Sequence, residues 1–329
     1  MVAILGKLTA GDDYPHPVTP VENFIESFLF HYTGYDQANQ PIGGLIRVAN
    51  RPNRGCAEAT MLVWLPGGVT LFNFERPAIT SNDHWQVSGW NLEVLKPGGQ
   101  LFRTRYEGTV LKLDDPRIMV DPKIGFKSPR TSIQFDLFHE GKGPVAEFSH
   151  SSLANAVEDR DAECGTYGTS QQFMKCSGTI TVEGLKTYSI QGYGWRDHNW
   201  GARNWQGFTD HEFLTGNPDD REGFALYRTF DGCGYLFHRG ESEVFRIADF
   251  QLDTEFAADG IEPISLRGEF ALENGERHTL TGVQKGYIPL RDKRGRLLTS
   301  IGYSLWEYSF DGRQCLGLGE FLRQSNLSS

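Results

Sequence analysis

The stretch from Tyr193 to Phe208 reads Tyr-Gly-Trp-Arg-Asp-His-Asn-Trp-Gly-Ala-Arg-Asn-Trp-Gln-Gly-Phe, and no other stretch of the chain groups so many large aromatic and ionisable side chains. Its three tryptophans lie five residues apart. On a helix this spacing would turn each ring by about 140° from the last, so the rings would share no face. In an extended strand, alternate side chains share a face instead.

If residues 195–200 are extended, the segment has two chemically different faces. Arg196, His198 and Trp200 lie on one face, and Trp195, Asp197 and Asn199 lie on the other. The first face offers a cation, a titratable imidazole and an indole together. Only one of the two faces can look into a barrel, and the sequence leaves open which one does.

Hairpin signals dominate the rest of the chain. Six pairs of apolar runs are joined by short turn sequences: 57–65 with 69–75, 88–95 with 100–107, 131–139 with 144–149, 223–229 with 234–238, 266–272 with 276–281, and 302–310 with 314–322. A helical turn is expected at 19–22, where Pro follows a capping threonine, with a strand after it. About sixteen short strands without a long amphipathic helix predict an all-β protein built as a sandwich or barrel.

The economical interpretation is two consecutive antiparallel β units. Residues 154–168 are polar and weakly patterned, which suggests a boundary near the end of that segment. We therefore expect an N-terminal β domain at 1–168 and a C-terminal β domain at 169–329 that carries the tryptophan-rich stretch.

Composition excludes several partners. The 329 residues carry a net charge of −10, which argues against nucleic acid or an anionic membrane surface as a partner. No apolar run approaches the roughly 18 residues of a membrane span, and the N-terminus does not resemble a signal peptide. The five cysteines are scattered, as is typical of free thiols in a reducing compartment. We expect a cytoplasmic protein, and nothing in the sequence supports a homo-oligomer.

No common cofactor or metal motif is present, so the sequence predicts neither an organic cofactor nor a metal. The best acid or base candidate is His198, next to Asp197, because an imidazole titrates near neutral pH. Neighbouring residues of a strand point to opposite faces, so Asp197 is not expected to bond His198 directly. A purely structural role for the pair, with His198 as a satisfied core residue, is about equally well supported.

The tryptophans also allow two interpretations. Trp195, Trp200 and Trp205 could line a cavity for an apolar ligand and stabilise a cation through their ring faces. They could instead plug a barrel end or pack between domains, as tryptophans often do. Arg203 could bind an anionic group or brace a backbone carbonyl.

The segment Gly192-Tyr-Gly-Trp-Arg-Asp-His-Asn-Trp-Gly-Ala-Arg-Asn-Trp205 resembles the signature of the lipocalin-like proteins grouped with carotenoid hydratase (hydroxyneurosporene synthase) and kievitone hydratase. Weaker similarities lie at 50–53, 105–108, 177–184 and 317–321. The resemblance implies two lipocalin-like β-barrel units in tandem and a hydrophobic ligand. It also implies addition or removal of water without an organic cofactor, with roles for Asp197, His198, Trp200 and Arg203.

One departure from the family pattern affects the chemistry. Relatives often carry a His-Tyr-Glu-Gln-His-like run before the Ser177-Gly178 strand, whereas this chain reads Thr169-Ser-Gln-Gln-Phe173, in which only Gln172 matches. Two histidines and a carboxylate are therefore absent from that position.

The sequence thus predicts a cofactor-independent hydratase or dehydratase (a lyase), or an isomerase, acting on a terpenoid, steroid-like or polyketide molecule. Asp197 and His198 are the expected catalytic residues. The expected substrate-binding residues are Trp195, Trp200, Arg203, Trp205, Gln172 and Tyr193. The alternatives are a non-catalytic lipocalin-like carrier of an apolar ligand and a cyclase that only preorganises its substrate.

Overall fold

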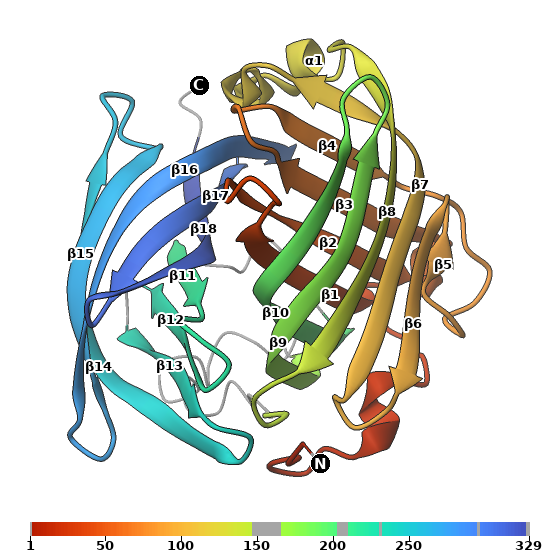
Figure 1. The fold of residues 1–329 in the computed structure, drawn as a ribbon. Coiled ribbons are helices and arrows are strands. Elements are labelled where there is room, and N and C mark those ends of the chain that lie inside the picture. Colours follow the sequence, from red (N-terminus) through yellow and green to blue (C-terminus); the bar gives the residue numbers. More distant parts are fainter. Residues whose placement is uncertain (1, 147–165, 203–209, 230–231, 295–296, 327–329) are drawn as a thin grey trace.

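The computed structural model describes residues 2–146, 166–202, 210–229, 232–294 and 297–326. The protein consists of two antiparallel β rings that lie side by side (Figure 1). The predicted all-β class with two tandem barrel-like units is therefore confirmed. Among the described residues, no helix is long and apolar enough to cross a membrane.

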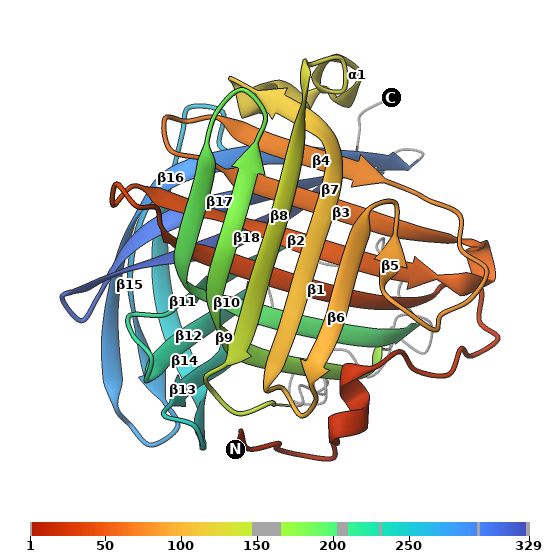
Figure 2. The same ribbon diagram turned by 45° about the vertical axis from the view of Figure 1, so that its right-hand side comes forward.

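The first ring contains eight strands in the order β4-β3-β2-β1-β10-β9-β8-β7, and β4 pairs back to β7 to close it; β6 and β5 continue outward from β7 (Figure 2). The ten strands of this sheet, the eight of the ring and the two beyond it, are β1 (Phe24–Tyr35), β2 (Pro41–Arg51), β3 (Cys56–Trp64), β4 (Thr70–Glu75), β5 (Gln86–Val87), β6 (Trp90–Lys96), β7 (Leu101–Leu113), β8 (Arg130–Gly141), β9 (Thr166–Val182) and β10 (Thr187–Ala202).

The second ring is a closed barrel of eight consecutive strands. They are β11 (His211–Gly216), β12 (Glu222–Thr229), β13 (Gly232–Arg239), β14 (Glu243–Phe256), β15 (Pro263–Leu272), β16 (Arg277–Arg294), β17 (Leu297–Phe310) and β18 (Arg313–Asn326). The helical elements are short: η1 (Ala10–Asp13), η2 (Pro52–Arg54), η3 (Pro116–Val120) and α1 (Pro122–Gly125).

Most predicted hairpins correspond to observed pairs, including β3–β4, β6–β7, β12–β13, β15–β16 and β17–β18. The helical turn expected at 19–22 is wrong, since that segment forms turns and bends before β1 begins at Phe24. In the segment predicted as a strand at 144–149, Val145 and Ala146 form isolated bridges only, and the residues from 147 lie outside the described part.

The two rings divide the chain at a different place from the expected boundary. The position between residues 168 and 169 lies inside β9, and both β9 and β10 belong to the first ring. The chain leaves the first ring after Ala202 and begins the second at His211. The tryptophan-rich strand is therefore part of the first ring, because β10 pairs with the whole length of β1. Local sequence patterns do not reveal this contact between distant segments.

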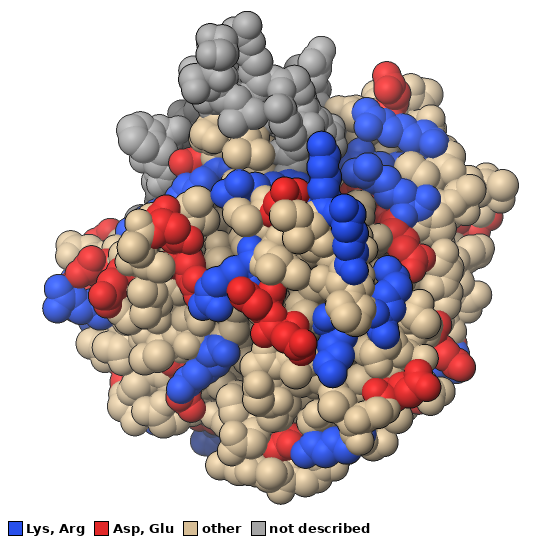
Figure 3. Space-filling view, turned by 90° about the horizontal axis from the view of Figure 1, so that it is seen from above, with Lys and Arg blue, Asp and Glu red and all other residues tan. Residues whose placement is uncertain are grey.

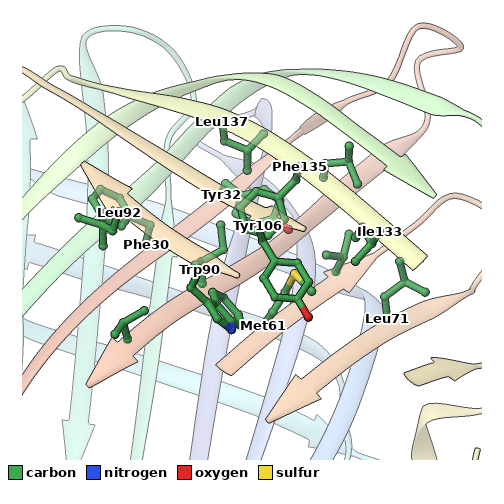
Figure 4. Packing of buried hydrophobic residues seen from close by; sticks show 14 of the residues in the cluster. Phe30, Tyr32, Met61, Leu71, Trp90, Leu92, Tyr106, Ile133, Phe135 and Leu137 are labelled. Atoms are coloured by element: carbon green, nitrogen blue, oxygen red, sulfur yellow. The ribbon is translucent and has the colours of Figure 1, made fainter. Parts of the chain in front are cut away.

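Aromatic side chains fill the interior of the first ring. From β1, Phe30 and Tyr32 point into it and are fully buried, and they meet Trp90, Tyr106 and Phe135 from the opposite strands (Figure 4). Burying one such side chain contributes roughly 1.5–3 kcal/mol, so this cluster is a main source of the stability of the ring.

The two rings also pack against each other through their outer faces. Leu45, Leu62 and Trp64 of the first ring form one buried cluster with Leu305 and Leu318 of the second. Residues far apart in sequence therefore share a continuous apolar interface, which fixes the two rings relative to each other.

Candidate acid and base cluster

Strand β10 lies between β1 and β9, and its alternate residues face different environments. His198 is paired with Phe28 and Arg196 with Phe30, and all four side chains are fully buried. Because directly paired residues of antiparallel strands share a face, Arg196 and His198 point into the first ring with the phenylalanines. The predicted alternation is therefore confirmed.

The other face of β10 points toward the second ring. Trp195 is fully buried there, with Phe173 beside it and Ala225 and Leu236 of the second ring in the same cluster. Asp197 lies on this face too and accepts a hydrogen bond from Nε2 of Gln171 at 2.9 Å. The structure thus places Asp197 and His198 on opposite sides of the sheet.

The imidazole of His198 is bonded through both of its nitrogens. Nε2 lies 2.9 Å from Oε1 of Glu26, and Nδ1 lies 2.9 Å from the backbone oxygen of Asp12. Phe28 stacks on the ring with centroids 4.5 Å apart, and Trp85 meets it edge-on at 5.4 Å. A backbone carbonyl only accepts hydrogen bonds, so Nδ1 of His198 must carry a proton.

Glu26 is the centre of the cluster. Besides His198, it accepts hydrogen bonds from Nδ1 of His16 at 2.6 Å, from the backbone N–H of His16, and from Nδ2 of Asn82 at 2.5 Å. Burial alone would raise the pKa of this carboxyl, but the hydrogen bonds from His16, His198 and Asn82 outweigh burial and hold the pKa of Glu26 at about 2.

His16 connects the cluster to solvent. Its Nε2 lies 3.0 Å from Oδ1 of Asp12, and its side chain keeps 17% of its surface exposed. Trp200 stacks on the imidazole with centroids 3.8 Å apart and planes 12° apart. Burial opposes charge on His16, but the carboxylates of Glu26 and Asp12 raise its pKa above the ordinary value.

These contacts indicate which nitrogen atoms of His198 hold a proton. Nδ1 of His198 donates to Asp12, so the contact between Nε2 and the ionised Glu26 is attractive only if that nitrogen also holds a proton. The two imidazoles and the carboxylate therefore form a chain that shares protons from the half-buried His16 to the fully buried His198.

A buried ion pair holds the N-terminal segment over this end of the ring. Nη1 of Arg196 lies 2.8 Å from Oδ1 of Asp13, and Nη2 donates to Oγ of Ser170. The other oxygen of Asp13 accepts the backbone N–H of Gly99. Asp13 is at the end of η1, whose first turn is capped by Thr9, so a local capping signal presents Asp12 and Asp13 to the ring.

Of the remaining predicted site residues that the structure describes, Trp200 lies beside His198, and Gln172 and Tyr193 have other partners. Nε2 of Gln172 donates to the backbone oxygens of Gly99 and Gly143, so Gln172 connects two loops. The hydroxyl of Tyr193 donates to Asp220 at 2.8 Å. Arg203 and Trp205 lie outside the described residues.

The sequence did not single out His16, Glu26 or Asn82. A signal for Glu26 was present, because it is the one charged residue on the alternating face of Phe24, Phe28, Phe30 and Tyr32. A carboxylate on an aromatic face requires buried hydrogen-bond donors. His16 and Asn82 lie in irregular segments, where no periodicity indicates which way a side chain points.

The same cluster has donor atoms of types that bind divalent metals. One nitrogen each from His16 and His198 and one oxygen from Glu26 all lie within 4.8 Å of one another. Each of these atoms already faces a protein partner at hydrogen-bonding distance. The expectation that the protein uses no metal stays a prediction.

A separate cleft of about 280 Å³ lies between the two rings. Within the described part of the chain, its lining includes none of the site residues predicted from the sequence and none of the cluster around Glu26.

Comparisons with known proteins agree with the fold. Residues 9–325 match the family described as Domain of unknown function (DUF7064). A protein from Nitrosomonas europaea described as a candidate AttH is similar in structure, with a TM-score of 0.65 over 98% of each chain and 13% identity. Kievitone hydratase from Nectria haematococca is similar with a TM-score of 0.50 over 91% of this chain and 88% of that one, at 12% identity. No curated protein matches by sequence.

At these identities the similarity shows a shared fold. The expected resemblance to kievitone hydratase is thus confirmed as a distant relation in fold. The closer relation to carotenoid hydratase stays a prediction.

Proposed function

The chain belongs to the DUF7064 family, and we propose that it is a cofactor-independent acid–base catalyst that hydrates, dehydrates or isomerises an apolar small molecule. The observation that carries this proposal is the chain of His16, Glu26 and His198, in which one carboxylate is hydrogen-bonded to two imidazoles. The fold similarity to a hydratase is in accord with the proposal and adds nothing about the substrate.

In the proposed reaction, His16 meets the substrate. It is the only one of the three groups with an exposed part, and the carboxylates of Glu26 and Asp12 raise its pKa, which favours the protonated form. For hydration, its proton is transferred to an alkene carbon, and the cation that forms is attacked by water, which then loses a proton. His198 supplies the replacement proton through the carboxylate of Glu26, and the proton that the water loses returns by the same route. Dehydration is the same sequence in reverse.

Trp200 has a defined part in this scheme. Its indole lies parallel to His16 at 3.8 Å, so the ring face stabilises the protonated imidazole that donates the proton. Such contacts contribute about 0.5–2 kcal/mol. Asp197 has no part in the scheme, because it lies on the other side of β10, where Gln171 binds it.

Turnover in labelled water tests the proposal. The protein is incubated in H₂¹⁸O with kievitone and with a panel of isoprenoid alkenes and alcohols, and products are identified by mass spectrometry. We expect a hydrated or dehydrated product, and a loss of roughly 100-fold or more in rate for His16→Gln and Glu26→Gln. His84→Gln, at an exposed position, is the matched control. Unchanged turnover in both variants with a native circular dichroism spectrum would refute the assignment.

A second candidate function is a non-catalytic carrier, favoured by the cleft between the rings, which is remote from the cluster. A carrier would bind an apolar ligand with the same affinity in wild type and in the His198→Gln variant, and no product would form. A terpenoid, steroid-like or polyketide substrate is part of both proposals.

A further inference from the structure

The cleft between the rings has three walls. The outer face of the first ring supplies one wall from β2, β3 and β4, the second ring supplies another from β16 and β17, and η3 and α1 close a third side. Most of the lining is apolar: Leu45, Phe72, Phe74, Met119, Phe126, Leu290, Ile301 and Tyr303. A volume of about 280 Å³ is close to the lower end of the range for small-molecule sites, roughly 300–1,000 Å³.

The charged groups of the lining are unbalanced. Three are arginines, Arg47, Arg76 and Arg291, and Glu58 is the single carboxylate in this part of the described structure. Glu58 already has ion pairs to Arg47 at 3.6 Å, to Arg76 at 3.6 Å and to Arg51 at 3.1 Å. One carboxylate is therefore shared by three guanidinium groups, and the lining of the cleft keeps an excess of positive charge.

Among the three arginines that line the cleft, Arg291 has the fewest protein partners in the described part of the chain. It lines the cleft from the second ring, and its Nε is buried with no hydrogen-bond partner among the described residues. Within the described ranges, no ion pair to Arg291 is present. A buried guanidinium N–H without a partner is unfavourable, and an anionic oxygen is the partner that would satisfy it best.

This excess is unusual for the molecule, whose net charge is −10. On the face seen from above, Lys and Arg side chains gather around the middle of the molecule with Asp and Glu side chains among them (Figure 3). An acidic protein that concentrates arginines beside an apolar cleft offers a local site for an anion, since nearby charges act over about 8–10 Å in physiological salt.

We propose that the cleft between the rings binds an amphipathic monoanion, an apolar small molecule with one carboxylate. The apolar part lies against Phe72, Phe74 and Ile301, and the carboxylate lies among the guanidinium groups of Arg76 and Arg291. The proposal goes beyond the acid–base function, because it assigns a ligand class to a site that contains no residue of the His16–Glu26–His198 cluster.

The test compares three probes that share one alkyl chain. Binding of decanoate, decan-1-ol and decyltrimethylammonium to the full-length protein is measured by isothermal titration calorimetry at two salt concentrations. We expect decanoate to bind at least tenfold more tightly than decanol and the cation not to bind, with the preference for decanoate reduced in high salt.

Variants then locate the site. Arg291→Met and Arg76→Met should each weaken decanoate binding about tenfold and leave decanol binding unchanged, and Leu290→Trp, which fills the cleft, should abolish both. Arg267→Met on the exposed face of β15 is the control. Arg76 is 56% exposed, so its variant should fold even if that of Arg291 does not. No decanoate binding to wild type, equal affinity for decanol, or an Arg76→Met affinity equal to wild type would each overturn the proposal.

Discussion

Replacing Glu26 by glutamine tests whether the ionised carboxylate of Glu26 contributes to the free energy of unfolding. The side chain is completely buried, and its hydrogen bonds from His16, His198 and Asn82 favour the charged form. Glutamine has nearly the same shape but cannot carry the charge. We therefore expect the variant to fold with reduced stability.

The magnitude follows from the pKa. In the folded protein the pKa of Glu26 is about 2, against 4.5 for an unperturbed glutamate. At about 1.4 kcal/mol for each pH unit, ionisation of Glu26 contributes about 3 kcal/mol to the free energy of unfolding at neutral pH. A depressed pKa gives stability that is complete above pH 4.5 and is lost as the pH falls toward 2. By the same relation, about 1.4 kcal/mol of the contribution is already lost at pH 3.5.

His16 acts in the opposite direction. Because its folded-state pKa is raised above 6.5, its contribution is complete below pH 6.5 and is lost as the pH rises through the raised value. The cluster as a whole therefore stabilises the protein most between about pH 4.5 and 6.5.

The assay is urea unfolding followed by tryptophan fluorescence at pH 6 and pH 3.5, for wild type and Glu26→Gln. The difference in unfolding free energy should be about 3 kcal/mol at pH 6 and about 1.4 kcal/mol smaller at pH 3.5. Glu93→Gln, which removes a partly exposed partner of Arg105, should change stability by under about 1 kcal/mol at both pH values. An equal difference at the two pH values for Glu26→Gln would refute the reasoning.

Three further predictions concern other parts of the molecule. His31 is fully buried between the rings, and burial lowers its pKa to about 4, so the free energy of unfolding should fall by about 3 kcal/mol as the pH falls from 6.5 to 4. In the His31→Gln variant this loss should be absent from unfolding curves measured in acid, and curves identical to those of wild type would contradict the prediction. Asp13→Ala leaves the guanidinium of Arg196 buried without its anion and should cost about 3–5 kcal/mol in urea unfolding, whereas a cost under 1 kcal/mol would show that the pair is not formed. Dialysis against EDTA should leave the melting temperature and any turnover unchanged, because Glu26 and both imidazoles already have protein partners; a lowered melting temperature restored by zinc would show a metal site instead.

Local sequence patterns were sufficient for most of the strands of this fold. Turn sequences such as Asn274-Gly275 and Asp311-Gly312 require backbone conformations that favour glycine, and they joined the expected strand pairs. Local patterns did not predict which distant strands pair to close the rings. The pairing of β1 with β10 joins residues from 156 to 178 positions apart, and neither strand alone indicates its partner.

The site was predictable only where it lies on a regular strand. Alternation along β10 correctly separated His198 from Asp197, because the period of a strand fixes which side chains share a face. It could not show what meets His198, because Asp12 and His16 come from an irregular segment that crosses the end of the ring.

The geometry of the cluster links its chemistry to folding. Glu26 and His198 are 172 residues apart in the chain and meet only when β10 pairs with β1 and closes the first ring. Asp12 and Asp13, next to each other in η1, then hold His198 and Arg196 of the same β10 face. Each of these contacts satisfies a group that would be costly to bury alone. The N-terminal segment therefore serves both as the element that satisfies the buried end of the ring and as the source of His16, the part of the proton-sharing chain that reaches solvent. A change that loosens this segment should weaken the stability of the first ring and any proton transfer together, whereas a change in the cleft between the rings should affect neither.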